Sequence, residues 1–390
     1  MITIEKAYDI VLQNAYLLGT EKVDFTVSLG RILAEDVKSD IEMPPFDKSA
    51  MDGYACRRED LENQLEIIET IPAGKYPEKE IGKNQCAKIM TGAPIPKGAD
   101  CVVPVEIAEE IAGKSVKVIE ISKKNNISYQ GEDVKVGTKV LGKGITIHAQ
   151  HIAIFAAVGY TRVLVYKQPK VGIISTGDEL VEPDQTPSLS QIRNSNGYQL
   201  IAQVKDCGAI ANYIGIADDT PEDTYDKVSK ALNENDIVLL TGGVSMGSFD
   251  FVPKVLEQAG VKIDFDAIAV KPGKPTTFGM AGKKFCFGLP GNPVSSFIQF
   301  DLLVKPLIYH LMGQDYQPLD IRMPMGINYT RRSTERNSYF PVMIKKGEIF
   351  PVDYHGSAHI HALSLAHGIA SIAIGKKEIK KGEMVHVRQI

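Results

Sequence analysis

Apolar residues at helical spacing open the chain. Between residues 3 and 18 they recur every three or four positions, as on the buried face of an amphipathic helix. Thr3 precedes the first of them and suits a helix cap. The apolar positions are Ile4, Ala7, Ile10, Val11, Ala15 and Leu18. A second helical pattern lies at 145–160, and we expect it to pack against the first helix.

The segment between these two patterns has a different character. From about Ile41 to Ile127, short runs rich in β-forming residues are broken by proline and glycine. Examples are IPAG at 71–74, GAPIP at 92–96 and VPV at 103–105. The pattern predicts a separate β-rich domain that is inserted between two segments which fold together.

Strands and helices alternate from residue 170 onward. β-rich apolar runs at 171–175, 209–217 and 236–240 are each followed by a helical pattern, and a long helix extends from Pro293 to about Leu311. This alternation predicts βαβ units and a mostly parallel sheet. Residues 314–390 alternate β-rich runs with turns, which predicts a small β domain. We therefore expect an α/β multidomain protein.

Composition and charge narrow the function classes. The 390 residues have a formal net charge of −4, which argues against nucleic acid as the main partner because no basic excess is present. The apolar stretches are too short to span a bilayer, and Glu5, Lys6 and Asp9 do not fit a secretory signal. Five scattered cysteines without metal-binding spacing suggest reduced thiols. We expect a cytoplasmic protein.

Three turns suited to anions follow predicted strands. TGGVSMG at 241–247 supplies glycines and hydroxyls, KPGKP at 271–275 supplies two lysines, and LPGNP at 289–293 opens the long helix. We expect Asn292 to cap that helix and Pro293 to occupy its first position. TGGVSMG alone would also suit a plain turn. Together, the turns predict one crevice at the carboxyl ends of parallel strands.

Acidic residues near these turns predict a magnesium site. Glu179 follows a strand that should be buried, and Asp250 follows the TGGVSMG turn. Carboxylates of this kind suit Mg²⁺ shared with a phosphate. Asp52-Gly53 could be a plain turn, and the acids at 131–133 could be solvated surface. We favour the absence of a transition-metal site at the histidine cluster His355, His359, His361 and His367, because no ligand spacing is evident.

Eight motifs together resemble one family over nearly the whole chain. They are FDKSAMDGYA (46–55), MTGAPIPKGAD (90–100), GEDV (131–134), STGDEL (175–180), IRNSNGYQL (192–200), TGGVSMGSFDFV (241–252), KPGKP (271–275) and LPGNPVSS (289–296). The chain resembles the molybdopterin molybdenumtransferases, which include MoeA and the C-terminal domain of gephyrin. The TGGVS motif alone is similar to MogA-type adenylyltransferases and CinA-like proteins, and the SAMDGYA segment distinguishes the chain from them.

The resemblance implies four domains. Residues 1–40 and 128–168 would form a small mixed linker and dimerisation domain, and 41–127 an inserted β-rich domain. Residues 169–313 would form a three-layer, MogA-like α/β domain that binds molybdopterin, and 314–390 a small β-barrel-like domain. The resemblance also implies an elongated homodimer, whose active cleft lies between the α/β domain of one subunit and the inserted domain of the other.

The resemblance further implies a reaction and the residues that perform it. Adenylylated molybdopterin and molybdate would bind, the phosphoanhydride would be cleaved with Mg²⁺, AMP would leave, and molybdenum would pass to the dithiolene sulfurs. Transient contacts with the adenylyltransferase and with recipient molybdoenzymes would follow. The catalytic residues would be Asp52, Glu179 and Asp250, the last two nearest the metal. The substrate-binding residues would be Thr91, Asp133, Thr241, Gly242, Gly243, Ser245, Lys271, Lys274, Pro290, Gly291, Asn292, Pro293 and Ser295.

Two positions depart from the family pattern. Many relatives carry a basic residue where this chain has Ala267, and an arginine where it has Ser128. Both changes remove part of the expected anion-binding set, which leaves a tungstate preference open as an alternative to molybdate. Two other functions also stay open: a MogA- or CinA-type adenylyltransferase or pyrophosphatase, and a non-catalytic scaffold.

Overall fold

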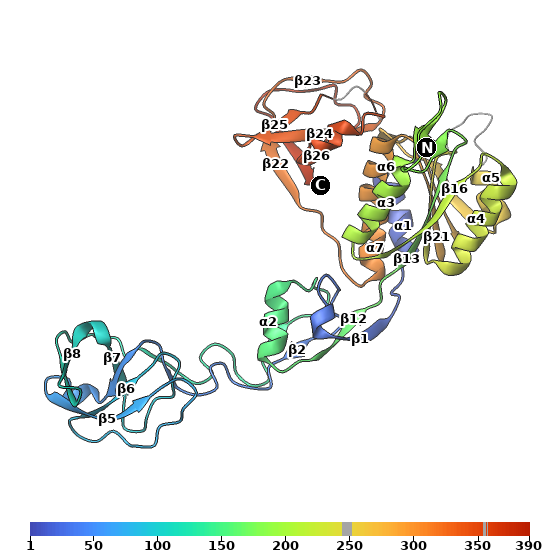
Figure 1. The fold of residues 1–390 in the computed structure, drawn as a ribbon. Coiled ribbons are helices and arrows are strands. Elements are labelled where there is room, and N and C mark those ends of the chain that lie inside the picture. The colour runs from blue at the N-terminus through green and yellow to red at the C-terminus, as the bar shows by residue number, and fades with distance from the viewer. Residues whose placement is uncertain (244–251, 354–355, 357) are drawn as a thin grey trace.

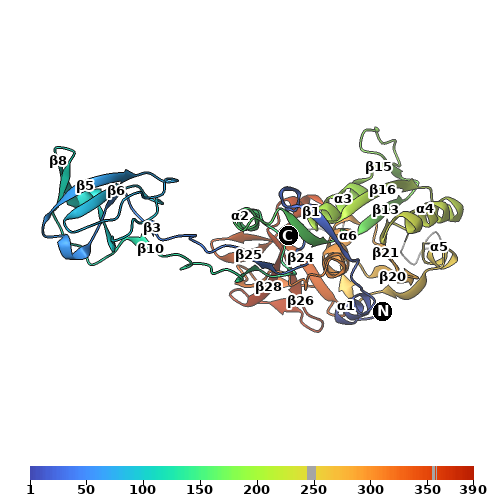
Figure 2. The ribbon, with the colours of Figure 1, turned by 90° about the horizontal axis from the view of Figure 1, so that it is seen from below.

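The protein has an elongated, multidomain shape. The computed structural model describes residues 1–243, 252–353, 356 and 358–390. An α/β domain and a C-terminal β domain lie side by side, and a narrow linker region connects them to a β domain at the far end (Figures 1 and 2). Among the described residues, none of the helices combines the length and apolar character needed to cross a bilayer.

A six-stranded sheet forms the centre of the α/β domain. Its strand order is β16-β13-β17-β21-β20-β18, and the first four strands are parallel. The strands are β13 (Lys170–Thr176), β16 (Ile210–Ala217), β17 (Ile237–Thr241), β18 (Lys262–Ala267), β20 (Pro275–Ala281) and β21 (Lys284–Leu289). The hairpin partners β20 and β21 are antiparallel, as are β18 and β20. The predicted mostly parallel sheet is therefore confirmed.

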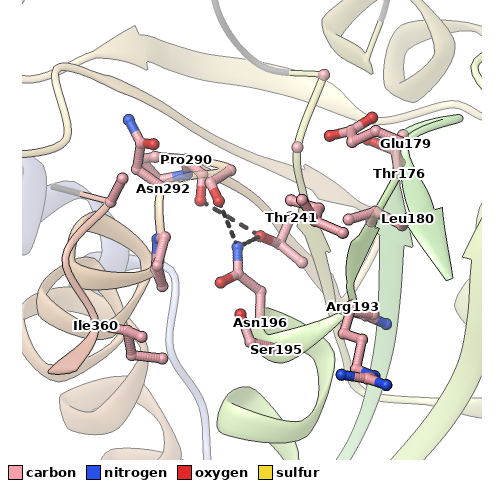
Figure 3. A pocket seen from close by; sticks show the side chains of 18 of the residues that line it. Thr176, Glu179, Leu180, Arg193, Ser195, Asn196, Thr241, Pro290, Asn292 and Ile360 are labelled. Atoms are coloured by element: carbon pink, nitrogen blue, oxygen red, sulfur yellow. Dashed lines mark hydrogen bonds between the residues drawn. The ribbon is translucent and has the colours of Figure 1, made fainter. Parts of the chain in front are cut away.

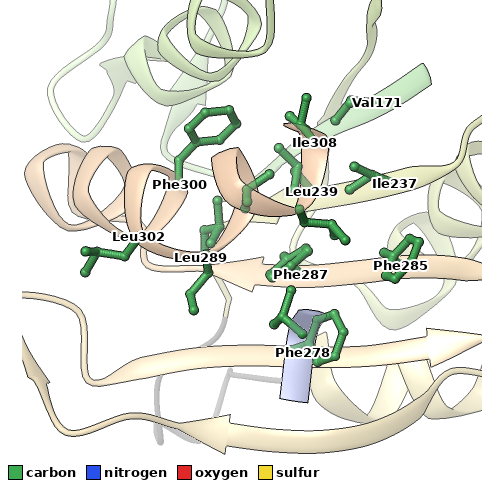
Figure 4. Packing of buried hydrophobic residues seen from close by; sticks show 14 of the residues in the cluster. Val171, Ile237, Leu239, Phe278, Phe285, Phe287, Leu289, Phe300, Leu302 and Ile308 are labelled. Carbon is green, nitrogen blue, oxygen red and sulfur yellow. The ribbon is translucent and has the colours of Figure 1, made fainter. Parts of the chain in front are cut away.

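Helices cover both faces of this sheet and give three layers. Ile237 and Leu239 of β17 face one core, which includes α3 (Ser195–Asp206) and the long helix (Figure 4). Val238 and Leu240 face the opposite core, with α4 (Pro221–Glu234) and α5 (Val252–Gln258). Because successive strand residues point to opposite faces, a continuously apolar strand is the expected sequence for this central position.

The long helix forms as predicted but contains an irregular segment. α6 (Pro293–Gln299) continues through a π-helical segment (Phe300–Val304) into α7 (Lys305–Leu311). Within the π-helical segment, Asp301 forms ion pairs with Lys305 and with Arg388 of the C-terminal domain, at 3.5 and 3.2 Å. The long helix therefore joins two domains.

Two expectations about the N-terminal helices are wrong. α1 (Ile4–Gln13) begins after its Thr3 cap but ends five residues earlier than expected, at the Asn14 C-cap. Its buried face packs into the α/β core, so it lies outside the linker domain expected for residues 1–40. α2 (Ala149–Ala157) packs instead in a separate core, around Phe155, with the linker strands β1 (Thr20–Asp24) and β12 (Arg162–Tyr166). Sequence periodicity identified each apolar face but not its partner.

The inserted domain is a six-stranded sheet of mixed direction. Its order is β7-β4-β6-β5-β9-β8. The strands are β4 (Gly53–Cys56), β5 (Gln64–Ile71), β6 (Gln85–Ile89), β7 (Cys101–Pro104), β8 (Ala108–Ile111) and β9 (Ser115–Val118). Gly53 is required in β4, since a Cβ atom there would lie 2.1 Å from the carbonyl oxygen of Val103. Short pairs form the neck: β3 (Lys48–Ser49) with β10 (Ile127–Ser128), and β2 (Val37–Lys38) with β11 (Lys139–Leu141).

The C-terminal domain is a small barrel-like sheet. Its order is β19-β24-β26-β28-β22, with β25 beside β24, and a bridge between Met325 and Ile349 brings β22 close to β25. The strands are β22 (Asp320–Pro324), β24 (Asn337–Lys345), β25 (Glu348–Pro351), β26 (Gly368–Ile372) and β28 (Met384–Gln389). Its edge strand β19 (Val270–Lys271) comes from the α/β domain, so the two domains share one sheet.

Candidate active site

A cavity of about 650 Å³ lies at the carboxyl ends of the parallel strands β13, β17 and β21. This is where side chains and turns of an open α/β sheet converge on a ligand. Eight of the residues expected from the sequence line it: Glu179, Thr241, Gly242, Gly243, Pro290, Gly291, Asn292 and Pro293. Ala358 and Ile360 of the C-terminal domain also line it. We call this cavity the cleft.

Asn196 joins the turns of the cleft to one another (Figure 3). Its Nδ2 donates to the hydroxyl of Thr241 at 2.9 Å and to the carbonyl of Gly291 at 2.7 Å. The Thr241 hydroxyl donates in turn to the carbonyl of Pro290 at 3.3 Å. Because a carbonyl only accepts, the amide of Asn196 has one possible orientation. The first turn of α3, the end of β17 and the LPGNP turn are thus held in one arrangement.

The glycine pair is required by the backbone at the end of β17. Gly242 has a φ of 99°, in the region that favours glycine, and a Cβ atom there would lie 2.4 Å from the carbonyl oxygen of Thr176. Gly243 has a φ of 61°, and its Cβ atom would lie 2.8 Å from the side chain of Val252. The two turns that follow β13 and β17 therefore approach each other more closely than side chains would permit.

The LPGNP turn differs from the expectation at one residue. Pro293 occupies the first turn of α6, as its fixed φ favours, but the Asn292 side chain makes no capping hydrogen bond. The expectation that Asn292 caps through its side chain is therefore wrong. Its amide is exposed at the cleft instead, beside the first N–H groups of a helix that continues to Leu311. Ser295 is buried within α6 and does not line the cleft.

Both signs of charge are present around the cleft. Glu179 and Asp219 supply carboxylates, and Arg193 supplies a guanidinium. The backbone N–H of Asp178 donates to the Asp219 carboxylate at 3.4 Å, and that of Asp219 donates to the Asp178 carboxylate at 2.9 Å. Glu179 is exposed to the cleft. This mixture suits a polyanion that is bound with a cation.

The two lysines of KPGKP lie beside the cleft and do not line it. Lys271 belongs to β19, which pairs with β24, and its side chain is exposed. Lys274 is also exposed, and the cleft receives Pro275 from this segment. Pairing with the C-terminal sheet, which the sequence did not indicate, determines this placement. Ala267, one of the two departures, is buried at the end of β18.

Asp52 and Thr91 meet in the inserted domain. The backbone N–H of Thr91 donates to Asp52 Oδ1 at 2.6 Å, and its hydroxyl donates to the same atom at 2.7 Å. These two bonds, the backbone bond first, lower the pKa of Asp52 below its usual value. Both side chains are exposed, and the domain that carries them lies far from the cleft of the same chain (Figures 1 and 2).

Asp133 lies at a third place, in a hollow of about 420 Å³ at the neck of the inserted domain. Pro44, Lys48 and Ser128 line the same hollow. Lys48 is the strand partner of Ser128 in the β3–β10 pair, so a cation lies opposite the position at which the resemblance led us to expect arginine. Apart from Ser295 and the two lysines of KPGKP, the expected site residues that the structure describes thus lie in the cleft, in the exposed Asp52–Thr91 pair or in this hollow.

Some expected residues lie outside the described part of the chain, namely Ser245, Asp250 and His355. Of the other histidines in that cluster, His367 accepts a bond from the backbone N–H of Ile344 at 3.0 Å, and His361 lies 3.4 Å from the Ser364 hydroxyl. Within residues 1–243, 252–353, 356 and 358–390, no group of three His, Cys, Asp or Glu side chains is arranged to hold a metal alone.

Several residues that line the cleft were not among those expected from the sequence. These are Thr176, Arg193, Asn194, Ser195, Asn196 and Asp219. All but Asp219 belong to the STGDEL and IRNSNGYQL motifs, and an Asn-Ser-Asn run at a helix start was the available signal. Asp219 follows β16, so its position after a parallel strand could also have indicated it.

Three family models match successive parts of the chain. The MoeA N-terminal region (domain I and II) matches residues 2–159, a probable molybdopterin binding domain matches 172–310, and the MoeA C-terminal region (domain IV) matches 328–390. The three matches follow the order in which the domains occur in the structure.

Known relatives match over most of their length. A molybdopterin molybdenumtransferase of Staphylococcus epidermidis is 35% identical, with 99% of this chain and 95% of the relative covered. One of Bacillus subtilis is 39% identical over 74% of this chain and 70% of its own. The crystal structure of a molybdopterin biosynthesis MoeA protein from Pyrococcus horikoshii OT3 matches with a TM-score of 0.86, 29% identity and full coverage of both chains. The chain belongs to the molybdopterin molybdenumtransferase family.

Proposed function

We propose that this protein transfers molybdenum from molybdate to adenylylated molybdopterin and releases AMP. The observation that carries the proposal is the cleft, where the TGG and LPGNP turns meet at the carboxyl ends of β17 and β21. The names of the relatives support the class of reaction. The protein therefore acts in molybdenum cofactor biosynthesis as a transferase.

The cleft suits the phosphates of this substrate. The N–H of Gly242 donates to the carbonyl of Leu289 at 3.2 Å, which leaves the backbone of Gly243 as the part of this turn that can approach an anion. The helix that starts at Pro293 favours negative charge at its N-terminal end. Arg193 adds a guanidinium that can bind phosphate or carbonyl oxygens with two donors. Asn196 keeps these parts at fixed separation, which reduces the reorganisation that binding requires.

The donor atoms also fit Mg²⁺, which prefers one or two carboxylates together with phosphate oxygens. Glu179 offers an exposed carboxylate that makes no ion pair to another described residue. Asp219 adds a second carboxylate to the lining of the cleft, and Asp250 follows the TGG turn in the sequence. A bound Mg²⁺ supplies charge neutralisation at the phosphoanhydride. Glu179 would hold the ion, while the turns orient the phosphates.

A homodimer would complete the site. Asp52 is exposed and its pKa is lowered, so it is ionised at neutral pH, yet the inserted domain that carries it lies far from the cleft of the same chain (Figure 1). A two-fold dimer places the same surface on both subunits, so the inserted domain of each could reach the cleft of the other. Asp52 and Thr91 would then face the adenylylated molybdopterin from across the interface. Hand-over from the adenylyltransferase and to recipient molybdoenzymes would involve transient contacts.

AMP release tests the proposed reaction. Purified protein with Mg²⁺ and adenylylated molybdopterin should release AMP, and molybdate should accelerate the release. Glu179→Gln keeps the size of the side chain and removes its charge, so it should lose most of this activity without a change in folding. If ATP is consumed with molybdopterin and no AMP is released from the adenylylated form, the protein is an adenylyltransferase.

Mixed dimers test the composite site. Asp52→Ala and Glu179→Gln homodimers should each be inactive. After random subunit exchange, half of the dimers are mixed and each has one site with both residues intact, so about a quarter of all sites should recover. Subunit exchange is verified with two affinity tags. Proven exchange without recovered activity would mean that each site is built within one chain.

A further inference from the structure

A short arm of the chain borders the cleft. This arm, residues 180–193, begins with β14 (Leu180–Val181) and ends with β15 (Ile192–Arg193), and the two strands pair in parallel. Glu179 precedes the arm directly, and Arg193 is its last residue, so both charged groups stand at its base. The placement of the arm therefore determines where a carboxylate and a guanidinium meet the substrate.

The carboxylate of Glu182 anchors this arm. Its Oε1 accepts a hydrogen bond from the Tyr213 hydroxyl at 2.7 Å, and its Oε2 accepts one from the Tyr198 hydroxyl at 3.0 Å. Tyr213 belongs to β16 and Tyr198 to α3, and their ring centroids are 5.5 Å apart. One side chain thus joins the arm to a strand and a helix of the α/β domain.

The network continues from Tyr213 to Asn194. Asn194 Nδ2 donates to the Tyr213 hydroxyl at 2.8 Å, while its Oδ1 accepts from the backbone N–H of Gly197 and from the Ser175 hydroxyl, both at 3.0 Å. A backbone N–H only donates, so the amide of Asn194 cannot be reversed. The Tyr213 hydroxyl must then donate to Glu182, because the carboxylate only accepts.

The protonation state of Tyr213 and the absence of a side chain at Gly197 both maintain the direction of these hydrogen bonds. Burial, followed by the hydrogen bond to Glu182, raises the pKa of Tyr213, so the phenol remains a donor at neutral pH. Gly197 leaves the space in which the groups meet. A Cβ atom there would lie 2.9 Å from Asn194 Nδ2 and 2.9 Å from Ser175 Oγ. Glycine at the start of α3 is therefore required for these groups to approach one another.

The network ends at the cleft itself. Asn194 caps α3 with its side chain, and the next two residues, Ser195 and Asn196, line the cleft. Asn196 then bonds to Thr241 and Gly291, which belong to the two turns described above. The hydrogen bonds that hold Asn194 and those that Asn196 makes to both turns are therefore joined through the backbone at 194–196.

We propose that Glu182 is a positioning residue for the cleft, which it acts on through Tyr213 and Asn194. The inference rests on the proposed function for the identity of the substrate but not for the network. Without the carboxylate, Tyr213 has no acceptor in place, and the cap of α3 loses its support. Arg193 and Asn196 would then sample more positions, and substrate affinity would fall while the chemical step changes less.

Three variants separate hydrogen bonding from charge. Glu182→Ala removes the acceptor. Glu182→Gln keeps an oxygen for Tyr213 and can donate to the exposed hydroxyl of Tyr198, so it should restore wild-type behaviour. The hydrogen bond to Glu182 chiefly raises the pKa of Tyr198, and Asp184, with the same charge on the same arm, adds to this through space. Asp184 makes no hydrogen bond to Glu182 or Tyr213, so Asp184→Ala is the matched control. If Glu182→Ala does not fold, Tyr213→Phe removes the donor and keeps the ring.

AMP binding by calorimetry, the kcat and KM of AMP release, and hydrogen exchange at residues 195–200 provide the readouts. Glu182→Ala should weaken AMP binding and raise KM about tenfold, which corresponds to about one charge-assisted hydrogen bond, with kcat within about twofold. Exchange at 195–200 should accelerate in this variant only. The inference is wrong if Glu182→Ala matches wild type in both affinity and exchange, or if Asp184→Ala has an equal effect.

The same experiment distinguishes failure of the inference from failure of the proposed function. If the wild-type protein neither binds nor releases AMP, the proposed function fails. The exchange comparison between Glu182→Ala, Glu182→Gln and wild type still decides whether Glu182 positions the start of α3. Unchanged exchange in Glu182→Ala, together with normal AMP release, would refute the positioning role alone.

Discussion

Replacement of Gly242 by alanine should damage the cleft, and the magnitude follows from the structure. The φ of 99° lies in a region that alanine rarely adopts, which costs about 1–3 kcal/mol. The new Cβ atom would also lie 2.4 Å from the carbonyl oxygen and 2.7 Å from the hydroxyl of Thr176. Such overpacking costs a further 1–3 kcal/mol, so we expect a total of about 3 kcal/mol.

Gly291→Ala is the matched control in the same cleft. Gly291 has no positive φ, and its Cβ atom would meet only the Cα atom of Gly242, at an ordinary contact distance of 3.5 Å. This variant should keep wild-type stability. The pair of variants therefore separates the effect of a forced backbone from the effect of an added methyl group.

The free-energy cost of Gly242→Ala can appear as lower stability or as weaker AMP binding, which calorimetric unfolding and AMP titration measure separately. If the turn keeps its shape, Gly242→Ala should lower the melting temperature of the α/β domain by roughly 6–12 °C. If the turn relaxes, the cost appears as AMP binding weakened by about a hundredfold. Wild-type stability together with wild-type AMP affinity in Gly242→Ala would refute the assignment of this turn to the site.

Three further predictions concern other parts of the molecule. Thr91→Val removes one hydrogen bond to Asp52 and should raise the pKa of that carboxyl toward its usual value, so the acidic limit of the pH–rate profile should move to higher pH. An unchanged profile would contradict a role for this pair. Gly53→Ala should separate β4 from β7 and accelerate hydrogen exchange in the inserted domain, while AMP binding to the cleft persists. Exchange as slow as in the wild type throughout residues 53–118 would contradict this prediction. Asp301→Ala leaves Arg388 and Lys305 without their buried partner and should destabilise the C-terminal domain by about 3 kcal/mol, with a smaller loss in Asp301→Asn, as measured by calorimetry.

The sequence predicted those parts of the fold that depend on local pattern. Alternation of apolar strands and helices identified the parallel sheet, and the Pro–Gly interruptions identified the inserted β domain. The partner of each apolar face was not predictable in the same way. α1 and α2 both have buried faces, yet they pack in different cores, since periodicity records that a face is buried and not what covers it.

The candidate site shows the same limit. The TGG and LPGNP turns were placed correctly at strand ends, because a glycine pair or a proline at a helix start has a local cause. Lys271 was expected at the substrate, but pairing of β19 with β24 takes it into the sheet of another domain. Asn196 was overlooked because its importance comes from contacts with Thr241 and Gly291, which are 45 and 95 positions away.

The most direct test of the proposed function is to measure where molybdenum resides after turnover. The protein is incubated with Mg²⁺, molybdate and adenylylated molybdopterin, and the pterin product is isolated and analysed for molybdenum and for AMP. The proposed reaction predicts about one molybdenum atom bound per pterin and one AMP released, with both lost in Glu179→Gln. Release of AMP that leaves the pterin without molybdenum would contradict the account, since the protein would then be a hydrolase and not a molybdenumtransferase.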